Sequence, residues 1–375
     1  MNITFLIGNG FDVGLGMDSQ FSDFFPQYIE ESKNKPEIIR ALSESIKNNS
    51  DEWSYFEEQL GEYTSNFRTS SKDAFLSPRT FLNQFRDFEV SFIRYLNKLE
   101  EKISFDDKNR IASVMQNGLA HFWEYPRLPY QSFQKIKEGM LYYKNEDITF
   151  NFISFNYTQT LENCLSAIPD KTISLYIDGL IKAKIGKVIH VHGLKNEYPI
   201  MGVNDAGQIL NEELASDKWF CRYLIKPEAN KANRTNFNQE AEVLLENSQI
   251  ICIYGMSMGK TDKKWWQQIM RCLAKYEHRQ MILFKYAPDY SSGNQFDRLQ
   301  MEDELIDHLG YHYCKEIDID VDKIVDRIHL AINENIFEMC LHYGKNTMEC
   351  LKNVITEEKK NSQLNLVKEL YGIQN

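Results

Sequence analysis

Hydrophobic and polar positions divide the chain into parts with different periods. The chain begins with a short apolar run at residues 3–7, which predicts a buried strand. From residue 17 to 148, apolar residues recur every three or four positions, as in the stretch TFLNQFRDFEVSFIRYL. That spacing predicts helices packed through one face, with the phenylalanines of this stretch in the core. We therefore expect a long helical segment directly after the first strand.

Short apolar runs return after this segment. They predict strands at 147–157, 187–193, 198–203, 248–257, 280–288 and 310–317. Helical patterns lie between several of these runs, and strands that alternate with helices indicate a parallel sheet covered on both faces. The unbroken apolar character of residues 250–254 and 281–284 is typical of strands buried on both sides.

From about residue 320 an apolar stripe predicts a return to helix. The stripe consists of Ile324, Val325, Ile328, Ala331 and Ile332. The predicted fold class is α/β, with a Rossmann-like, doubly wound, mostly parallel sheet, a large helical insertion and a helical C-terminal tail. We expect a Rossmann-like nucleotide-binding domain at 1–318, interrupted by the insertion at 17–148, and the tail at 319–375.

Four glycines follow the first strand in the stretch GNGFDVGLG, at Gly8, Gly10, Gly14 and Gly16. They fit a plain strand and turn, or a loop whose backbone amides approach a pyrophosphate because no side chains stand in the way. The spacing is GxGxxxG, and a helical segment replaces the second strand expected of an NAD-dependent dehydrogenase. The pattern therefore disfavours ordinary hydride transfer.

Small and polar residues follow the predicted carboxyl ends of several strands. They are Gly8 to Asp12, Asn156 to Thr158, His190 to Gly193, Asn204 with Asp205, and Gly255 to Ser257. Ligands of doubly wound sheets bind at this edge. The joint pattern predicts a binding site there more strongly than any single member does.

Individual residues at this edge allow more than one interpretation. Asn156 or Thr158 fits as a helix cap, and Asp12 either closes the glycine turn or orders a ribose or a water. His190 and His192 alternate along a predicted strand, so we expect them on one face, as a buried bonded pair or as metal ligands. His192 could also serve as a general base near neutral pH.

Two further positions are candidates for the same edge. Glu57 belongs to a predicted packed helix of the insertion and could reach inward from it. Gly255 and Ser257 form a strand–loop–helix turn, or they contact a second part of a nucleotide.

Composition narrows the function classes. The net charge of −11 argues against broad nucleic-acid binding, which needs a basic surface. Seven scattered cysteines without a CxxC pair fit reduced thiols and exclude a ribbon-type zinc site. No stretch approaches the length of a membrane span, so a cytoplasmic protein without a membrane partner is expected.

Four stretches occur in a characteristic order: FLIGNGFDVGLGMDSQFSDF, SFNYTQTLE, HVHG and IYGMSMGKTD. In these the chain resembles the AbiH group of bacteriophage abortive-infection proteins, itself similar to the sirtuin-like NAD-binding superfamily. The resemblance spans Ile3 to about Asp262. It implies that Asn156 and His192 act on the nicotinamide ribose. It also implies that the cofactor-binding residues are Gly8, Asn9, Gly10, Phe11, Asp12, Thr158, Gly255 and Ser257.

The resemblance implies an antiphage effector that hydrolyses NAD to nicotinamide and ADP-ribose without a metal. Deacylation is not expected, because the chain lacks the four-cysteine module of deacylating sirtuins. Two alternatives stay open: a non-catalytic sensor of NAD or ADP-ribose, and a metal-dependent hydrolase or nuclease. The latter would use His190 and His192, with Asp12 and Asp205 as carboxylates. A phage-derived trigger or partner protein and a homo-oligomer are compatible with the sequence, which does not separate hydrolysis from cyclisation.

Overall fold

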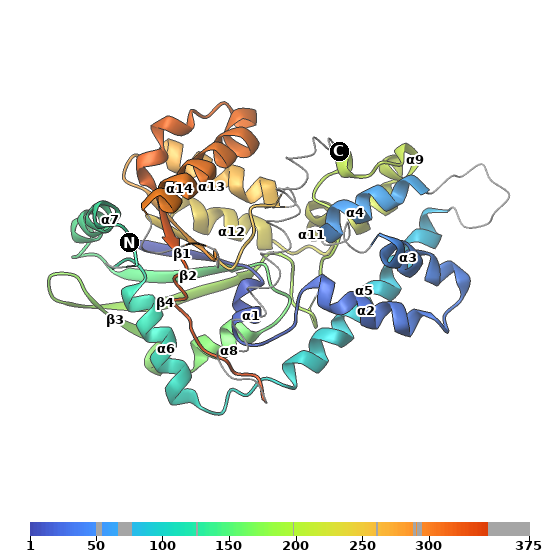
Figure 1. Ribbon diagram of the computed structural model, residues 1–375, viewed down its shortest axis with the longest axis horizontal. Helices are drawn as coiled ribbons and strands as arrows, with labels where there is room; N and C mark the ends of the chain where they lie inside the picture. The colour runs from blue at the N-terminus through green and yellow to red at the C-terminus, as the bar shows by residue number, and fades with distance from the viewer. Residues whose placement is uncertain are drawn as a thin grey trace.

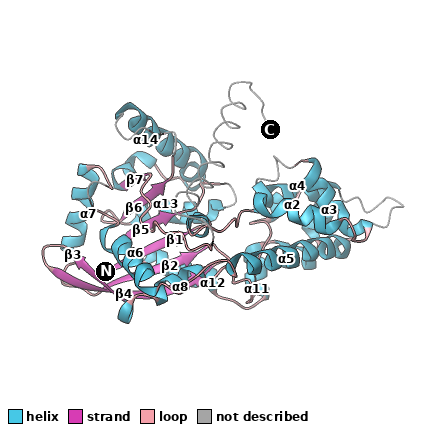
Figure 2. Ribbon diagram, turned by 60° about the horizontal axis from the view of Figure 1, so that its bottom comes forward, coloured by secondary structure: helices cyan, strands magenta, loops and turns pink. Residues whose placement is uncertain are grey.

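A seven-stranded sheet forms the centre of the protein (Figures 1 and 2). The structure, a computed structural model, describes residues 1–49, 55–66, 77–124, 127–197, 199–259, 262–287, 290 and 295–343. The strands are β1 (Asn2–Ile7), β2 (Ile148–Ser154), β3 (Thr172–Tyr176), β4 (Leu180–His190), β5 (Ile250–Tyr254), β6 (Gln280–Lys285) and β7 (Ile328–Ile332).

Helices connect and cover these strands. Those before β2 are α1 (Gly10–Gly14), α2 (Phe21–Ser32), α3 (Glu37–Asn48), α4 (Phe56–Tyr63), α5 (Pro78–Glu100), α6 (Lys108–His121) and α7 (Tyr130–Tyr142). Those after it are α8 (Thr160–Ser166), α9 (Glu212–Ser216), α10 (Lys218–Leu224), α11 (Lys226–Ala232), α12 (Phe237–Glu246), α13 (Lys263–Lys275) and α14 (Gln295–Leu309).

The order of the strands is that of a Rossmann-like sheet. It runs β3-β4-β2-β1-β5-β6-β7, and every pair is parallel except the β3–β4 hairpin. Without β3, the six parallel strands lie in the chain order third, second, first, fourth, fifth, sixth, which is the order of dinucleotide-binding folds. The direction of winding reverses between β1 and β5. The carboxyl ends of these two strands therefore form the switch point where such sheets bind ligands.

Both faces of the sheet are buried, which explains the unbroken apolar runs. Along β1, Phe5 packs into one core and Leu6 into the other, as expected when successive side chains point to opposite faces. The first core includes α1 and helices of the insertion, among them α5 and α6, and the second includes α13 and α14 (Figure 1). The predicted α/β sheet covered on both faces is confirmed.

Helices α2 to α5 form a body beside the sheet, next to α9, α10 and α11 (Figure 1). Its centre is aromatic: Phe88 of α5 packs against Phe24 of α2 and Phe56 of α4. Burial of this stripe is the outcome that the helical spacing of the sequence predicts. The insertion is therefore a packed helical unit whose α4 also contacts the segment after β4.

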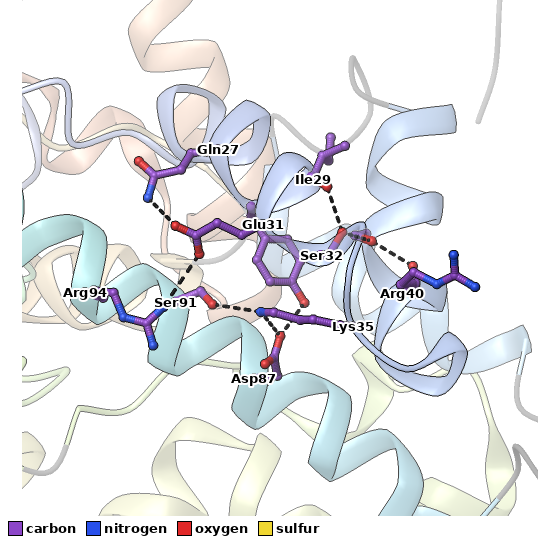
Figure 3. A network of polar contacts seen from close by, with 11 residues as sticks. Gln27, Ile29, Glu31, Ser32, Lys35, Arg40, Asp87, Ser91 and Arg94 are labelled. Atoms are coloured by element: carbon purple, nitrogen blue, oxygen red, sulfur yellow. Dashed lines mark hydrogen bonds and ion pairs between the residues drawn. The ribbon is translucent and has the colours of Figure 1, made fainter.

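Polar contacts hold α2, and Lys35 in the turn after it, against α5 (Figure 3). Lys35 pairs with Asp87 of α5 at 2.7 Å, and Glu31 accepts from Gln27 and faces Arg94. These groups have partners within the insertion. We therefore assign them to its architecture rather than to a site.

Three predicted elements differ in the structure. Residues 310–317, predicted as a strand, form a π-helix (Gly310–Cys314) and a 3₁₀ turn, and residues 199–203 of the predicted strand 198–203 form a loop. Residues 328–332, predicted as part of a helical tail, are strand β7, which pairs in parallel with β6. A short, mostly apolar run fits a strand as well as a helix, and the neighbouring strand with which it pairs decides between them. Residues 344–375 of the predicted tail lie outside the described residues.

Candidate functional site

The glycine loop packs directly on the turn after β5. The amide of Gly8 donates to the Tyr254 carbonyl at 2.9 Å, and that of Gly10 donates to the Gly255 carbonyl at 2.8 Å. A Cβ on Gly8 would lie 2.4 Å from the Gly255 oxygen, so only glycine allows this approach. The expectation that these two amides face a pyrophosphate is wrong for this structure, because both amides donate to carbonyl groups at the end of β5 and in the turn after it.

This packing leads to a matched pair of predictions within α1. We expect Gly10→Ala to lower the free energy of unfolding by about 1–3 kcal/mol, because its Cβ would lie 2.6 Å from the Gly255 Cα. Gly14→Ala at the other end of the helix meets nothing within 4 Å and should leave stability unchanged or raise it by up to about 1 kcal/mol. Urea unfolding measures both. Equal effects of the two variants would contradict the close packing.

Asp12 ties the loop after β1 to the loop after β2. Its carboxylate is 1% exposed and accepts from the hydroxyls of Thr158, at 2.5 Å, and Thr160. Burial raises the pKa of Asp12 to about 6, although the two hydroxyls act to lower it. Both carboxylate oxygens are thus bonded internally. In this structure Asp12 and Thr158 form a buried clamp under the site.

The raised pKa of Asp12 predicts a specific pH dependence. The protonated form is favoured on folding, so its contribution to stability is complete below the unfolded pKa near 3.8 and is lost as pH rises through about 6. We expect the stability of the wild type relative to Asp12→Asn to fall with pH over this window, by up to about 1.4 kcal/mol per pH unit. Urea unfolding of both proteins between pH 4 and 8 measures it, and a pH-independent difference would contradict the assignment.

Asn156 lies beside Asp12, in the loop between β2 and α8. The residue is 5% exposed, and neither Oδ1 nor Nδ2 has a hydrogen-bond partner among the described residues, although the amide is near enough to lower the Asp12 pKa. An unsatisfied buried polar group costs about 1–3 kcal/mol. Buried amides without partners are rare, and a bound molecule is one explanation for this one.

His190 is the last residue of β4 and bonds on both sides of its ring. Nδ1 lies 2.8 Å from the Asn156 carbonyl oxygen, and Nε2 lies 2.5 Å from Glu162 of α8. Burial acts to lower the pKa of His190, but the hydrogen bond and charge of Glu162 raise it above its ordinary value. His190 therefore belongs to the support of the Asn156 loop.

His192 lies beyond the end of β4 and has different neighbours. Its ring stacks on Tyr157 and meets the edge of Phe155. Burial and the charge of Lys226 hold the pKa of His192 well below its ordinary value, so the imidazole is neutral at pH 7. The expectation that the two histidines share one strand face as a pair does not hold, because β4 ends between them.

The helical insertion supplies charge to this edge through Glu57. Glu57 of α4 pairs with Lys226 at the start of α11, a lysine that is only 3% exposed. The Lys226 Nζ also lies 3.5 Å from Nε2 of His192. An ammonium can only donate, so Nε2 is the acceptor and Nδ1 carries the proton of His192. Glu57 thus reaches inward as the sequence suggests.

Lys226 is a site residue that the sequence pattern did not single out, because its stretch CRYLIKPEA is mixed and also carries Arg222 and Glu228. Asp262 is the N-cap residue of α13, and its carboxyl group interacts electrostatically with the same ammonium. Burial raises the pKa of Asp262 to about 7, against the attraction of Lys226. Glu57 and His192 therefore both contact one buried cation, Lys226, and the charge of that cation also acts on Asp262.

The other predicted cofactor-binding residues lie at the same edge with mixed surroundings. Phe11 is buried and packs against Tyr254 and Phe337. The Asn9 carboxamide accepts a hydrogen bond from Ser19 at 2.7 Å, and Ser257 is exposed after β5. Phe11 is therefore a core residue, whereas Ser257 is open to a ligand.

The geometry gives no support to a metal site. Among the described residues, no three histidine, cysteine, aspartate or glutamate side chains are grouped so as to hold an ion. Two of the proposed ligands already bond other groups. His190 bonds the Asn156 carbonyl and Glu162, and Asp12 bonds Thr158 and Thr160.

In the part of the chain that the structure describes, no helix is long and apolar enough to cross a membrane.

A family model described as bacteriophage abortive infection AbiH matches residues 4–284. The chain belongs to the AbiH family. The AbiH match runs from β1 to β6 and takes in every site residue described above. Membership of AbiH indicates a role in abortive infection of bacteriophage. No curated protein matches the chain.

Proposed function

We propose that this AbiH protein acts in abortive infection by hydrolysing NAD at the nicotinamide–ribose bond, at the sheet edge around Asn156 and His192. The observation that carries the proposal is the Asn156 amide, which is buried beside the switch point of a Rossmann-like sheet and has no hydrogen-bond partner within bonding geometry among the described residues. Such an edge binds nucleotides in many proteins of this fold, and the free amide offers both a donor and an acceptor.

The reaction needs a ribose held in place and a water that loses a proton. NAD and water give ADP-ribose, nicotinamide and one proton, as the C–N bond breaks and a C–O bond forms. Asn156 has an oxygen and a nitrogen free for the ribose hydroxyls and the attacking water. Binding holds the ribose and the water in the geometry of the reaction. This lowers the activation barrier, because the entropy loss of bringing the two together has already occurred on binding.

In this proposal His192 accepts the proton. Its Nε2 carries a lone pair because the imidazole is neutral at pH 7, but the lowered pKa makes His192 a weak base and corrects the expectation of a base that titrates near neutral pH. Lys226 now donates to that nitrogen, so a water must displace the ammonium from Nε2 before proton transfer. The contact therefore predicts slow turnover at rest, which suits an activity that would harm the cell.

The same contact favours one alternative. If Lys226 stays on Nε2, the site binds NAD or ADP-ribose without cleaving it, and the protein is a sensor. The Gly8 and Gly10 amides support neither version, because they are bonded to the β5 turn.

Infected cells separate the two functions. Cells that express the wild type should lose most of their NAD after phage infection, and His192→Ala should abolish both this loss and the protection. Asn163→Ala, an exposed change on α8, is the matched control and should behave as the wild type. Protection with an unchanged NAD content would overturn the hydrolase proposal, and protection retained by His192→Ala would favour the sensor.

A further inference from the structure

A histidine and a glutamate hold the backbone of Asn156 from two other elements. His190 comes from the end of β4 and is 6% exposed, and Glu162 comes from α8. The ring lies between the Asn156 carbonyl, 2.8 Å from Nδ1, and the Glu162 carboxylate, 2.5 Å from Nε2. The site residue itself, Asn156, makes no side-chain bond within the described residues that could fix it.

The chemistry of the two partners determines the charge of the ring. A carbonyl oxygen and an ionised carboxylate can only accept hydrogen bonds. With Glu162 ionised, both ring nitrogens donate, and His190 carries two protons and a positive charge, in the direction of its raised pKa. His192, two residues later, is neutral because burial and the charge of Lys226 lower its pKa, and its Nε2 accepts from Lys226. Neighbouring groups whose environments favour opposite protonation states are typical of sites that divide roles between them.

We propose that His190 and Glu162 are positioning residues, which hold Asn156 in the orientation that nicotinamide–ribose cleavage requires. This inference rests on the proposed function. The imidazolium clamps the Asn156 carbonyl, and the carboxylate keeps the imidazolium charged. Loss of one ring proton leaves one of the two acceptors without its donor and frees the Asn156 loop to move.

The pH response follows from the groups that face His190. Glu162 and Asp12 favour its charged form, whereas burial of the ring opposes it. The pKa of His190 is raised, so the clamp is complete below the ordinary histidine pKa and is lost as pH rises through the folded value. The turnover number should therefore fall on the alkaline side of that value.

Glu162→Gln tests the pair, because glutamine keeps the size and an acceptor but removes the charge. We expect its kcat for nicotinamide release to match the wild type near pH 5.5 and to be about tenfold lower at pH 8, because the alkaline limb moves to lower pH. Glu124→Gln is the matched control, since Glu124 bonds His121 in a more exposed histidine–glutamate pair on and after α6. It should leave the pH profile unchanged.

Nitrogen NMR of histidine-labelled protein reads the charge without activity. The His190 signal, assigned by its absence from His190→Gln, should be that of an imidazolium at pH 7 and should titrate at lower pH in Glu162→Gln. A neutral His190 at pH 7, or an equal loss of kcat at every pH, would overturn the inference. A charged His190 in a wild type that binds NAD but releases no nicotinamide would instead overturn the proposed function and the positioning role with it.

Discussion

Asn156→Ala should reduce nicotinamide release by roughly 10²–10³-fold, the range seen when one polar group that stabilises a transition state is removed. The free energy of unfolding should not fall, because the lost side chain makes no hydrogen bond among the described residues. The variant also removes a buried amide that has no partner among the described residues, and this removal favours the folded state. Single-turnover release and urea unfolding on the same preparation measure the two quantities.

The combination of lost activity and retained stability is what distinguishes a site residue from a structural one. Asn163→Ala on the neighbouring helix α8 controls for general effects of the substitution and should retain full activity. Loss of stability in Asn156→Ala in step with activity would assign Asn156 to the fold. Unchanged activity would place the chemistry elsewhere in the protein.

Breaking the Glu57–Lys226 pair should lower the free energy of unfolding more than the glycine and asparagine substitutions at the same sheet edge. The pair joins the helical insertion to that edge, and both groups are largely buried, with side-chain exposures of 14% and 4%. Removal of one partner from a buried ion pair costs about 3–5 kcal/mol, because a charge is left without compensation. We expect this loss for Glu57→Gln and for Lys226→Met, measured by urea unfolding.

The double variant makes this test specific. Glu57→Gln with Lys226→Met removes both charges and should regain most of the stability, so the effects of the single variants should not add. Lys231→Met, in an exposed pair with Glu228 on the same helix α11, should cost less than about 1 kcal/mol. Additive losses in the double variant would show that the two residues act separately.

The sheet could be predicted because its strands are buried on both faces. Runs such as residues 3–7 and 250–254 lack charged positions, and a covered parallel sheet accommodates them. The polar residues after each apolar run marked the ends of the strands. Asn156 and His192 stand at such ends, and this is why they could be identified as candidates. The helices of the insertion could be predicted from the spacing of apolar residues every three or four positions. The buried aromatic residues of α5 confirm that this face packs inward.

Features that depend on distant partners could not be predicted. Strand β7 exists because β6 offers an unpaired edge, and nothing local separates its sequence from a helix. The glycine loop matches a phosphate-binding pattern, but in the structure its first two glycines, Gly8 and Gly10, pack against Gly255, far along the chain. Likewise, the charge of His190 depends on Glu162 and a carbonyl, which only the folded loops bring together.

The charge states of the groups near Lys226 could not be predicted from the sequence either. A sequence gives the residue types but not their burial, and burial is what raises the pKa of Asp262 and lowers that of His192. The insertion reaches Lys226 through one residue, Glu57, out of a long helical segment. No periodicity could have distinguished that glutamate from its neighbours.

The central claim is that the edge around Asn156 and His192 cleaves NAD. The most direct test incubates purified full-length protein, in molar excess over NAD, and separates the products by chromatography, with and without extract of phage-infected cells. We predict nicotinamide and ADP-ribose in equal amounts from the wild type, and intact NAD from His192→Ala. Full recovery of NAD from the wild type under both conditions would contradict the account.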